Sequence, residues 1–232
     1  MPDKAGPSTG SQTLSRGIRL LEILAAAGRS MTIDELAGSL GVHRSVAYRL
    51  LRTLEDHGLT AREVSGRVVL GAGLAALAAG VSRDLQHAAL PELRVVANEL
   101  GMTSLLAVTL DGDEAVTLSS AAPQHSVAVA YRPGHRHPLT RGAPGKAILL
   151  GLPESTWPEG LRAELERSRA RGFTVSHDEV VPTLWSVAVP LTIGGQSTAS
   201  IGVIHVSLPR PEAEIAERLA AAADAIGRRL GG

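Results

Sequence analysis

The chain has 232 residues, of which 44% are hydrophobic, so it can bury a sizeable core and is not disordered as a whole. Its 23 basic and 23 acidic residues give a net charge of zero, which excludes a polycation that binds nucleic acid through bulk charge. The sequence contains no cysteine, which excludes disulfides, cysteine-ligated zinc and thiol nucleophiles.

The N-terminal residues 1–12 are polar and rich in glycine, proline and serine, and they lack the apolar stretch of a signal peptide. They are expected to form a flexible tail. The longest apolar run, residues 71–81, falls short of the roughly 20 residues that a membrane helix requires. We therefore expect a cytoplasmic protein with no membrane partner.

Two short helices are expected between residues 14 and 40. Leu14 to Ala26 carries apolar residues at helical spacing, which predicts one buried face. That face consists of Leu14, Ile18, Leu21 and Leu24. Thr32 and Glu35 have the spacing of a capping box, which predicts the start of the second helix, and Gly41 is placed to end it.

A third helix and a hairpin follow. The helix is expected from His43 to His57, and its apolar side consists of Ala47, Leu50, Leu51 and Leu54. Thr60 to Leu70 predicts a β-hairpin with Ser65-Gly66 at the turn. Two helices joined by a tight turn and followed by a hairpin are typical of a winged helix-turn-helix, which we place at residues 13–71.

Arginine, serine and tyrosine side chains on this unit suit a DNA-binding surface. Arginine can donate two parallel hydrogen bonds to guanine in the major groove, whereas contacts to phosphate position a protein without reading sequence. The predicted DNA-binding residues are Arg44, Ser45, Tyr48 and Arg49 for the groove, Arg52 nearer the backbone, and Arg62 and Arg67 on the hairpin. The alternative is a protein-interaction module with a solvated face, because basic residues only slightly outnumber acidic ones here.

Residues 72–86 are expected to form a linker with a short helix, Leu74 to Arg83, before a second domain at residues 87–232. A helix over His87 to Leu100 precedes a change to alternating periodicity. Strands are expected at Ser104–Thr109, Glu114–Ser119, Val127–Tyr131, Phe173–Ser176, Ser186–Leu191 and Thr198–Ser207, with turns at Asp111-Gly112 and Gly194-Gly195. Further helices are expected at Gly145–Leu150, Leu161–Arg171 and Glu212–Leu230. This mixture predicts an α+β sheet domain with helices covering one side.

Four segments, taken together and in this order, resemble the IclR family of bacterial transcriptional regulators. They are Leu14–Leu21; Leu40–Leu51; Gly134–Leu139 followed by Gly145-Lys146-Ala147; and Arg171-Gly172-Phe173 with Asp178-Glu179 and Ser186–Pro190. The resemblance implies a winged helix-turn-helix joined by a short helix to a GAF-like antiparallel-sheet domain. It also implies a homodimer or homotetramer, a double-stranded DNA operator that is palindromic, and a small-molecule effector. We expect a repressor.

The resemblance places effector binding in the C-terminal domain, where this chain departs from the family pattern. Thr183 stands where glycine is usual, and Ser186 where cysteine is frequent. His205 and Ser207 are two residues apart on an expected strand, so they are expected on one face, with Ser186 on a neighbouring strand. The predicted effector-binding residues are Ala143, Pro144, Ser176, Trp185, Ser186, His205 and Ser207, which suit an organic acid. The alternative is a core histidine with serines that cap strand ends.

Three other patterns are weighed and set aside. In residues 141–147 the spacing between the glycines is too short for a phosphate loop. Ala147 also stands where such a loop needs a serine or threonine hydroxyl to bind Mg²⁺. His135 and His137 have a metal-like spacing without an evident third ligand, so neither metal nor cofactor is expected. The rival function is an enzyme that uses His177, Asp178 and His205 on a small-molecule-binding domain. We expect no enzyme, because the chain has neither a nucleophile elbow nor a cysteine.

Overall fold

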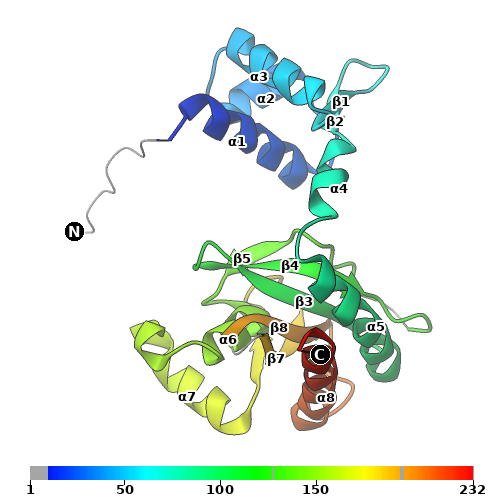
Figure 1. The fold of residues 1–232 in the computed structure, drawn as a ribbon, viewed down its shortest axis with the longest axis vertical. Helices are drawn as coiled ribbons and strands as arrows, with labels where there is room; N and C mark the ends of the chain where they lie inside the picture. Colours follow the sequence, from blue (N-terminus) through cyan, green and yellow to red (C-terminus); the bar gives the residue numbers. More distant parts are fainter. Residues whose placement is uncertain (1–9, 127, 194–195, 232) are drawn as a thin grey trace. The chain divides into compact units, whose positions relative to one another are not determined.

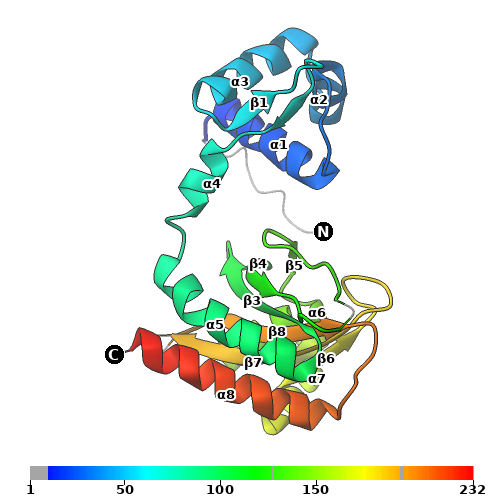
Figure 2. The ribbon, with the colours of Figure 1, turned by 90° about the vertical axis from the view of Figure 1, so that its right-hand side faces the viewer.

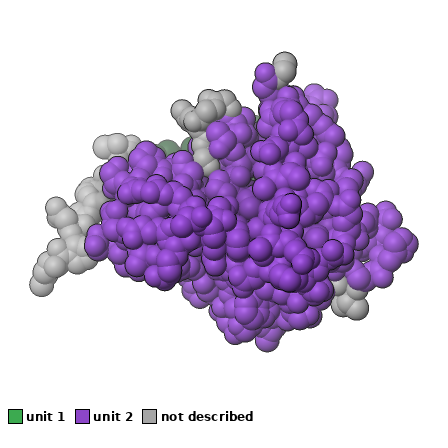
Figure 3. Space-filling model, turned by 90° about the horizontal axis from the view of Figure 1, so that it is seen from below, with its two compact units in different colours: residues 1–81 green, residues 82–232 purple. Residues whose placement is uncertain are grey.

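The computed structural model describes residues 10–126, 128–193 and 196–231. Residues 1–9 of the expected tail, Val127 and the expected Gly194-Gly195 turn lie outside the described residues. The chain divides into two compact units, Met1–Val81 and Ser82–Gly232, which Figure 3 colours separately. Within the described ranges, no helix is long and apolar enough to cross a membrane.

The first unit contains three helices, a two-stranded hairpin and a short fourth helix (Figure 1). These elements are α1 (Gln12–Ala27), α2 (Ile33–Leu40), α3 (Arg44–Asp56), β1 (Thr60–Arg62), β2 (Val68–Leu70) and α4 (Gly73–Ala78). Leu20, Leu36, Leu51 and Val68 are fully buried, so one core joins α1, α2, α3 and the hairpin. The expected winged helix-turn-helix is confirmed, with helix ends that shift by only one or two residues.

The buried face of α1 differs from the predicted one. Leu24 is buried as expected, but Leu14 is 64% exposed and Ile18 is 49% exposed. Gly17 and Leu20 are buried in their place. The helix carries two interleaved apolar stripes, and periodicity alone cannot decide which of them packs against α2 and α3.

The second unit is built on a six-stranded antiparallel sheet with the order β5-β4-β3-β8-β7-β6. The strands are β3 (Thr103–Leu110), β4 (Glu114–Ala121), β5 (Arg136–Pro138), β6 (Thr174–His177), β7 (Trp185–Ile193) and β8 (Gln196–His205). The helices are α5 (Arg83–Leu100), α6 (Gly142–Leu150), α7 (Arg162–Arg171) and α8 (Glu212–Leu230), with 3-10 turns at Glu154–Thr156 and Glu159–Leu161. The α+β class is therefore confirmed.

Helices cover both faces of this sheet, which corrects the expectation of cover on one side. Helices α5 and α8 lie side by side in Figure 2 and share a core with Val187 and Val203. Helix α6 packs on the opposite face, where Ala143 and Ala147 contact Ala188 of β7. Every residue of α6 is buried, because its small residues allow a close approach to the sheet.

Two further expectations are corrected. Residues 128–131 form no strand; the hydroxyls of Thr103 and Ser120 bond the carbonyls of Val129 and Tyr131 instead. The strand that pairs with β4 on the side away from β3 is β5 (Arg136–Pro138). The linker helix ends at Ala78, and the next helix begins already at Arg83, because Ser82 adopts a φ of 45° that interrupts the helical path.

Glu35 closes the capping box of α2, and we expect this contact to make the first unit acid-sensitive. The Thr32 N–H donates to Glu35 Oε2 at 2.6 Å, and this bond, helped by Arg29, lowers the pKa of Glu35 from 4.5 to about 2. A carboxyl whose pKa is lower in the folded than in the unfolded chain stabilises the fold at pH values above the pKa of the unfolded chain. This stabilisation is lost as the pH falls through the pKa of the folded chain. Its contribution is therefore present above about pH 4.5 and lost toward pH 2.

Glu35→Gln should lower the unfolding temperature at pH 7 and match the wild-type chain at pH 2. Thermal unfolding followed by circular dichroism across that pH range measures both. If the unfolding temperature of the variant lay below that of the wild-type chain by the same amount at pH 7 and at pH 2, the role assigned to the Glu35 carboxylate would be contradicted.

Candidate functional site

The second helix of the helix-turn-helix, α3, begins at an exposed histidine. His43 is the N-cap residue: its Nδ1 accepts a hydrogen bond from the Ser45 N–H at 3.3 Å and lies 2.9 Å from Ser45 Oγ. Nδ1 accepts only in the tautomer whose proton is on Nε2. The helix therefore begins with an exposed N–H donor that sequence reasoning missed, because histidine is not among the residues typical of this position.

The exposed face of α3 carries two unpaired arginines. The side chains of Arg49 and Arg52 are exposed and form no ion pair or hydrogen bond within the part of the chain that the structure describes. Arg44 contacts Asp34 at 2.8 Å, but both side chains are about two-thirds exposed, so this ion pair is weak and can open. Ser45 and Tyr48 are exposed on the same helix.

The two hairpin arginines differ in their surroundings. Arg62 Nε lies 2.8 Å from Glu55 Oε1, and its guanidinium carbon lies 6.0 Å from the centre of the Tyr48 ring, so it links the hairpin to α3. Arg67 Nη2 donates to the Ser30 carbonyl and to Glu35 Oε2, both at 2.9 Å. Arg67 thus ties the hairpin to the start of α2, whereas the sequence predicted a contact with phosphate or the minor groove.

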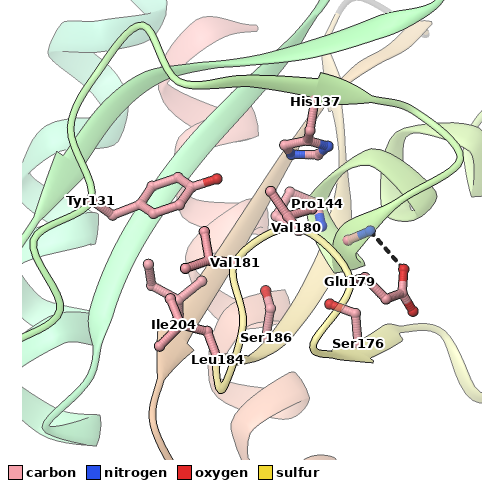
Figure 4. A pocket seen from close by; sticks show the side chains of 11 residues that line it. Tyr131, His137, Pro144, Ser176, Glu179, Val180, Val181, Leu184, Ser186 and Ile204 are labelled. Carbon is pink, nitrogen blue, oxygen red and sulfur yellow. Dashed lines mark hydrogen bonds between the residues drawn. The ribbon is translucent and has the colours of Figure 1, made fainter. Parts of the chain in front are cut away.

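In the second unit a pocket of about 30 Å³ lies at the N-terminal end of α6 (Figure 4). Its polar side chains are those of Tyr131, His137, Ser176, Glu179 and Ser186, its apolar side chains those of Pro144, Val180, Val181, Leu184 and Ile204, and Gly142 completes the lining. This volume is room for a few water molecules. A larger ligand requires the loop of residues 178–184, which supplies four of the lining residues, to move.

The first backbone N–H groups of α6 are bonded inside the protein. Gly142 N–H donates to Glu179 Oε2 and Ala143 N–H donates to Ser176 Oγ, each at 2.8 Å. Pro144 has no N–H, so it lines the pocket without the donor expected there. Helix α6 is therefore capped by β6 and the following loop. Glu179 lies 37 positions from Gly142 in a segment that resembles the family's signature, which indicates a structural or pocket-rim role but does not show that its carboxylate caps α6.

Ser186 presents an unused polar group to the pocket. Its side chain is buried, and its Oγ has no hydrogen-bond partner among the described residues. The close-up in Figure 4 shows this hydroxyl directed into the pocket. A buried hydroxyl needs a hydrogen-bond partner, so the Ser186 Oγ can bond to a polar group of a ligand or to a water molecule in the pocket.

Four predicted effector residues are not part of the pocket lining: Ala143, Trp185, His205 and Ser207. Antiparallel pairing sets Ser186 opposite Ile204 and Trp185 opposite His205. Because successive side chains on a strand point to opposite faces, Trp185 and His205 face away from the pocket. Ser207 is exposed beyond β8, where its N–H donates to His205 Nδ1 at 3.2 Å.

The groups considered for an enzyme also lie away from the pocket. His177 pairs with Trp185 across the strands, and their rings stack at 4.2 Å. Asp178 Oδ2 lies 3.3 Å from His177 Nδ1. Across the described ranges, no three histidine, aspartate or glutamate side chains are grouped to hold a metal ion.

The aromatic groups of the pocket wall are uncharged at neutral pH. Burial lowers the pKa of His137 and raises that of Tyr131 to about 12. Charge at the pocket therefore comes from Glu179 and from its partner Lys146, whose Nζ lies 2.6 Å from Glu179 Oε1. An anion that replaced the Glu179 carboxylate would meet a cation and a helix N-terminus.

Comparison with known proteins identifies the family. A family model described as the IclR helix-turn-helix domain matches residues 13–63. An HTH-type transcriptional regulator of Mycobacterium tuberculosis is 30% identical over 240 residues, which cover 92% of this chain and 90% of that protein. The transcriptional repressor IclR of Escherichia coli is 29% identical over 198 residues, or 75% of this chain and 72% of that protein.

Solved structures agree over the full length of both units. An IclR transcriptional regulator from Alicyclobacillus acidocaldarius has a TM-score of 0.84 at 27% identity and covers 96% of this chain and 100% of its own. An IclR homolog from Microbacterium hydrocarbonoxydans, complexed with 4-hydroxybenzoate, has a TM-score of 0.82 at 23% identity and covers 95% of this chain and 99% of its own. The relatives are transcriptional regulators rather than enzymes. This chain belongs to the IclR family of transcriptional regulators.

Proposed function

We propose that this regulator is a repressor that binds a palindromic DNA operator and responds to a small organic acid. The observation that carries the proposal is the exposed face of α3, where Arg49 and Arg52 have no partner in the described structure. A charged face left without internal counterions suits an anionic partner. Repression is supported by relatives named as repressors, among them IclR of Escherichia coli and AllR of Salmonella typhi.

We divide the proposed DNA contacts according to whether each side chain is exposed or held by other residues of the protein. Arg44, Ser45, Tyr48 and Arg49 read the major groove, and Arg52 contacts the backbone. Arg62 reaches phosphate from the hairpin, while Arg67 positions the hairpin without touching DNA. A palindromic operator requires two copies of this unit, so we propose a homodimer or homotetramer, as such symmetry is common among oligomers.

The proposed effector site is the pocket at α6. Pro144, Ser176 and Ser186 remain from the predicted set, Gly142 and Glu179 join them, and Ala143 contributes through its N–H, which holds the Ser176 hydroxyl. The solved relative complexed with 4-hydroxybenzoate supports an organic acid as the class of ligand. Apolar side chains on one side of the pocket and hydrogen-bonding groups on the other suit a small molecule of this kind.

In-vitro selection from random duplex DNA tests the DNA-binding function. The purified protein should enrich a palindrome, and its affinity for that site should fall as salt is raised, because phosphate contacts release counterions. Arg49→Ala should weaken specific binding about 10–100-fold if the side chain pairs with one guanine. Arg167→Ala, which removes an exposed arginine of α7 in the second unit, is the matched control. Undiminished specific affinity of the Arg49 variant would refute the groove assignment.

A structural role for Arg67 predicts a loss of stability confined to the first unit. Arg67→Ala should lower the free energy of unfolding of that unit by about 1–3 kcal/mol, since Glu35 and the Ser30 carbonyl lose a charged donor. Both tryptophans, Trp157 and Trp185, lie in the second unit. Urea unfolding should therefore shift when followed by circular dichroism and stay unchanged when followed by tryptophan fluorescence. A shift of the fluorescence transition would contradict this role.

The effector site predicts that acids depend on Ser186 for binding. In a screen of small organic acids by thermal shift, Ser186→Ala should weaken any acid that binds the wild-type chain by about tenfold, the value of a lost hydrogen bond. Ser207→Ala removes a hydroxyl outside the pocket and should leave binding unchanged. The pocket assignment fails if the Ser207 variant loses binding and the Ser186 variant keeps it.

A further inference from the structure

The start of α6 already holds a carboxylate that belongs to the protein. Glu179 Oε2 accepts the Gly142 N–H at 2.8 Å, and its Oε1 accepts from Lys146 Nζ at 2.6 Å. The Lys146 side chain is only 4% exposed, and its Nζ also lies 2.7 Å from Glu164 Oε1 on α7. Glu179 thus occupies an anion-binding position with two donors of different kinds, a helix N–H and a buried ammonium.

The segment that carries Glu179 is also the cover of the pocket. Val180, Val181 and Leu184 of the loop 178–184 line it, and Figure 4 shows this loop crossing in front of Ser186. Val180 presses against the first residue of α6, since a Cβ added to Gly142 would lie 2.7 Å from Val180 Cγ2. Moving Glu179 away from Gly142 therefore also moves part of the pocket wall.

One backbone position in this loop is strained. Thr183 adopts a φ of 68°, a left-handed region that is unfavourable for a β-branched residue, whereas Asp178, at 60°, is of a type that this region accepts. The Thr183 N–H donates to Asp178 Oδ1, which ties the two residues together. The bonds of Glu179 further attach this loop to α6.

Ser186 supplies an independent sign that a ligand belongs here. Its buried Oγ is unpartnered among the described residues and is directed into the pocket (Figure 4). The enclosed part of the pocket, about 30 Å³, has room for only a few water molecules, so an organic acid that is buried there needs more space than this structure provides. The pocket has one polar side chain without a partner among the described residues and one anion position that Glu179 fills.

We propose that Glu179 is an internal competitor of the effector, and that a monocarboxylate binds by displacing it. The ligand carboxylate takes the Gly142 N–H and Lys146 Nζ, the loop 178–184 opens, and Ser186 bonds a polar group of the ligand. This inference rests on the proposed effector function. The ligand class follows from the exchange, because it vacates a position for one carboxylate. The neighbouring side chains of Val181, Leu184 and Ile204 offer only apolar contact.

The exchange conserves charge at the buried lysine. One carboxylate replaces another, so Lys146 keeps two anionic partners and is not left uncompensated in the interior. The ligand must compete with the Glu179 carboxylate, which is present at an effective concentration because it is attached to the same chain. Glu179 therefore sets the effector concentration at which the pocket opens, and removing it should raise the affinity for acids.

Chemical rescue of a Glu179 variant tests the proposal. Thermal unfolding of the full chain is measured with sodium formate, acetate, butyrate, benzoate and succinate, and with sodium chloride at equal ionic strength. Glu179→Ala should unfold at a lower temperature and recover saturably with monocarboxylates, which should bind it at least about tenfold tighter than the wild-type chain. Butyrate should stabilise it more than succinate. Glu166→Ala, which removes an exposed carboxylate of α7, is the matched control and should show no rescue.

A second variant guards against a failure to fold. Glu179→Gln keeps an acceptor for the Gly142 N–H but loses the charge that faces Lys146, so it should also bind monocarboxylates more tightly than the wild-type chain. Equal stabilisation of both Glu179 variants and the wild-type chain, or the same effect from chloride, would overturn the proposal. Equal rescue by succinate would overturn the monocarboxylate class.

The outcome is separable from that of the proposed function, because the rescue assay needs no DNA and a second assay measures whether the same acids change DNA binding by the wild-type chain. Rescue without any effect of these acids on DNA binding would support the competition by Glu179 and refute the proposed response to organic acids. Acids that release DNA from the wild-type chain without rescuing either Glu179 variant would support the function and refute the competition.

Discussion

The buried N-terminus of α6 is the constraint on which the second unit's site depends. The first N–H groups of a helix have no partner within the helix, and inside a protein they must find acceptors elsewhere. Ser176 from β6 and Glu179 from the following loop supply them. Meeting this requirement brings β6, the loop and α6 together, and the pocket forms where they meet. The binding site is thus a consequence of how one helix end is satisfied.

Arginine has two separate uses in the first unit. Arg67 is held by Ser30 and Glu35 and fixes the hairpin, whereas Arg49 and Arg52 are left exposed on α3 without partners among the described residues. In a chain with no net charge, this division matters more than the number of basic residues. Placing acids beside the structural arginines leaves Arg49 and Arg52 of α3 as positive charges without a counterion among the described residues.

The pocket combines a family architecture with side chains of this chain's own. Ser186 offers a hydroxyl where the family pattern has a frequent cysteine, and the apolar loop residues narrow the cavity. Lys146 is buried at its edge and Glu179 is half-buried there; together with Glu164, two carboxylates face one ammonium, so the lysine is compensated without a ligand. Such a site responds to an acid by exchange of anions rather than by filling an empty cation site, which links ligand binding to movement of the loop.

The sequence by itself determined the elements that depend on local interactions. The Thr32–Glu35 capping box, the apolar side of α3, the Asp111-Gly112 hairpin and the terminal helix Glu212–Leu230 follow from short-range hydrogen bonds and periodicity. Tertiary structure decided which face of α1 is buried, that His205 opposes Trp185 and points away from the pocket, and that Glu179 caps a helix 37 positions away. A periodic pattern states which side of an element is apolar, but strand register and long-range acceptors depend on partners that only the folded chain brings together.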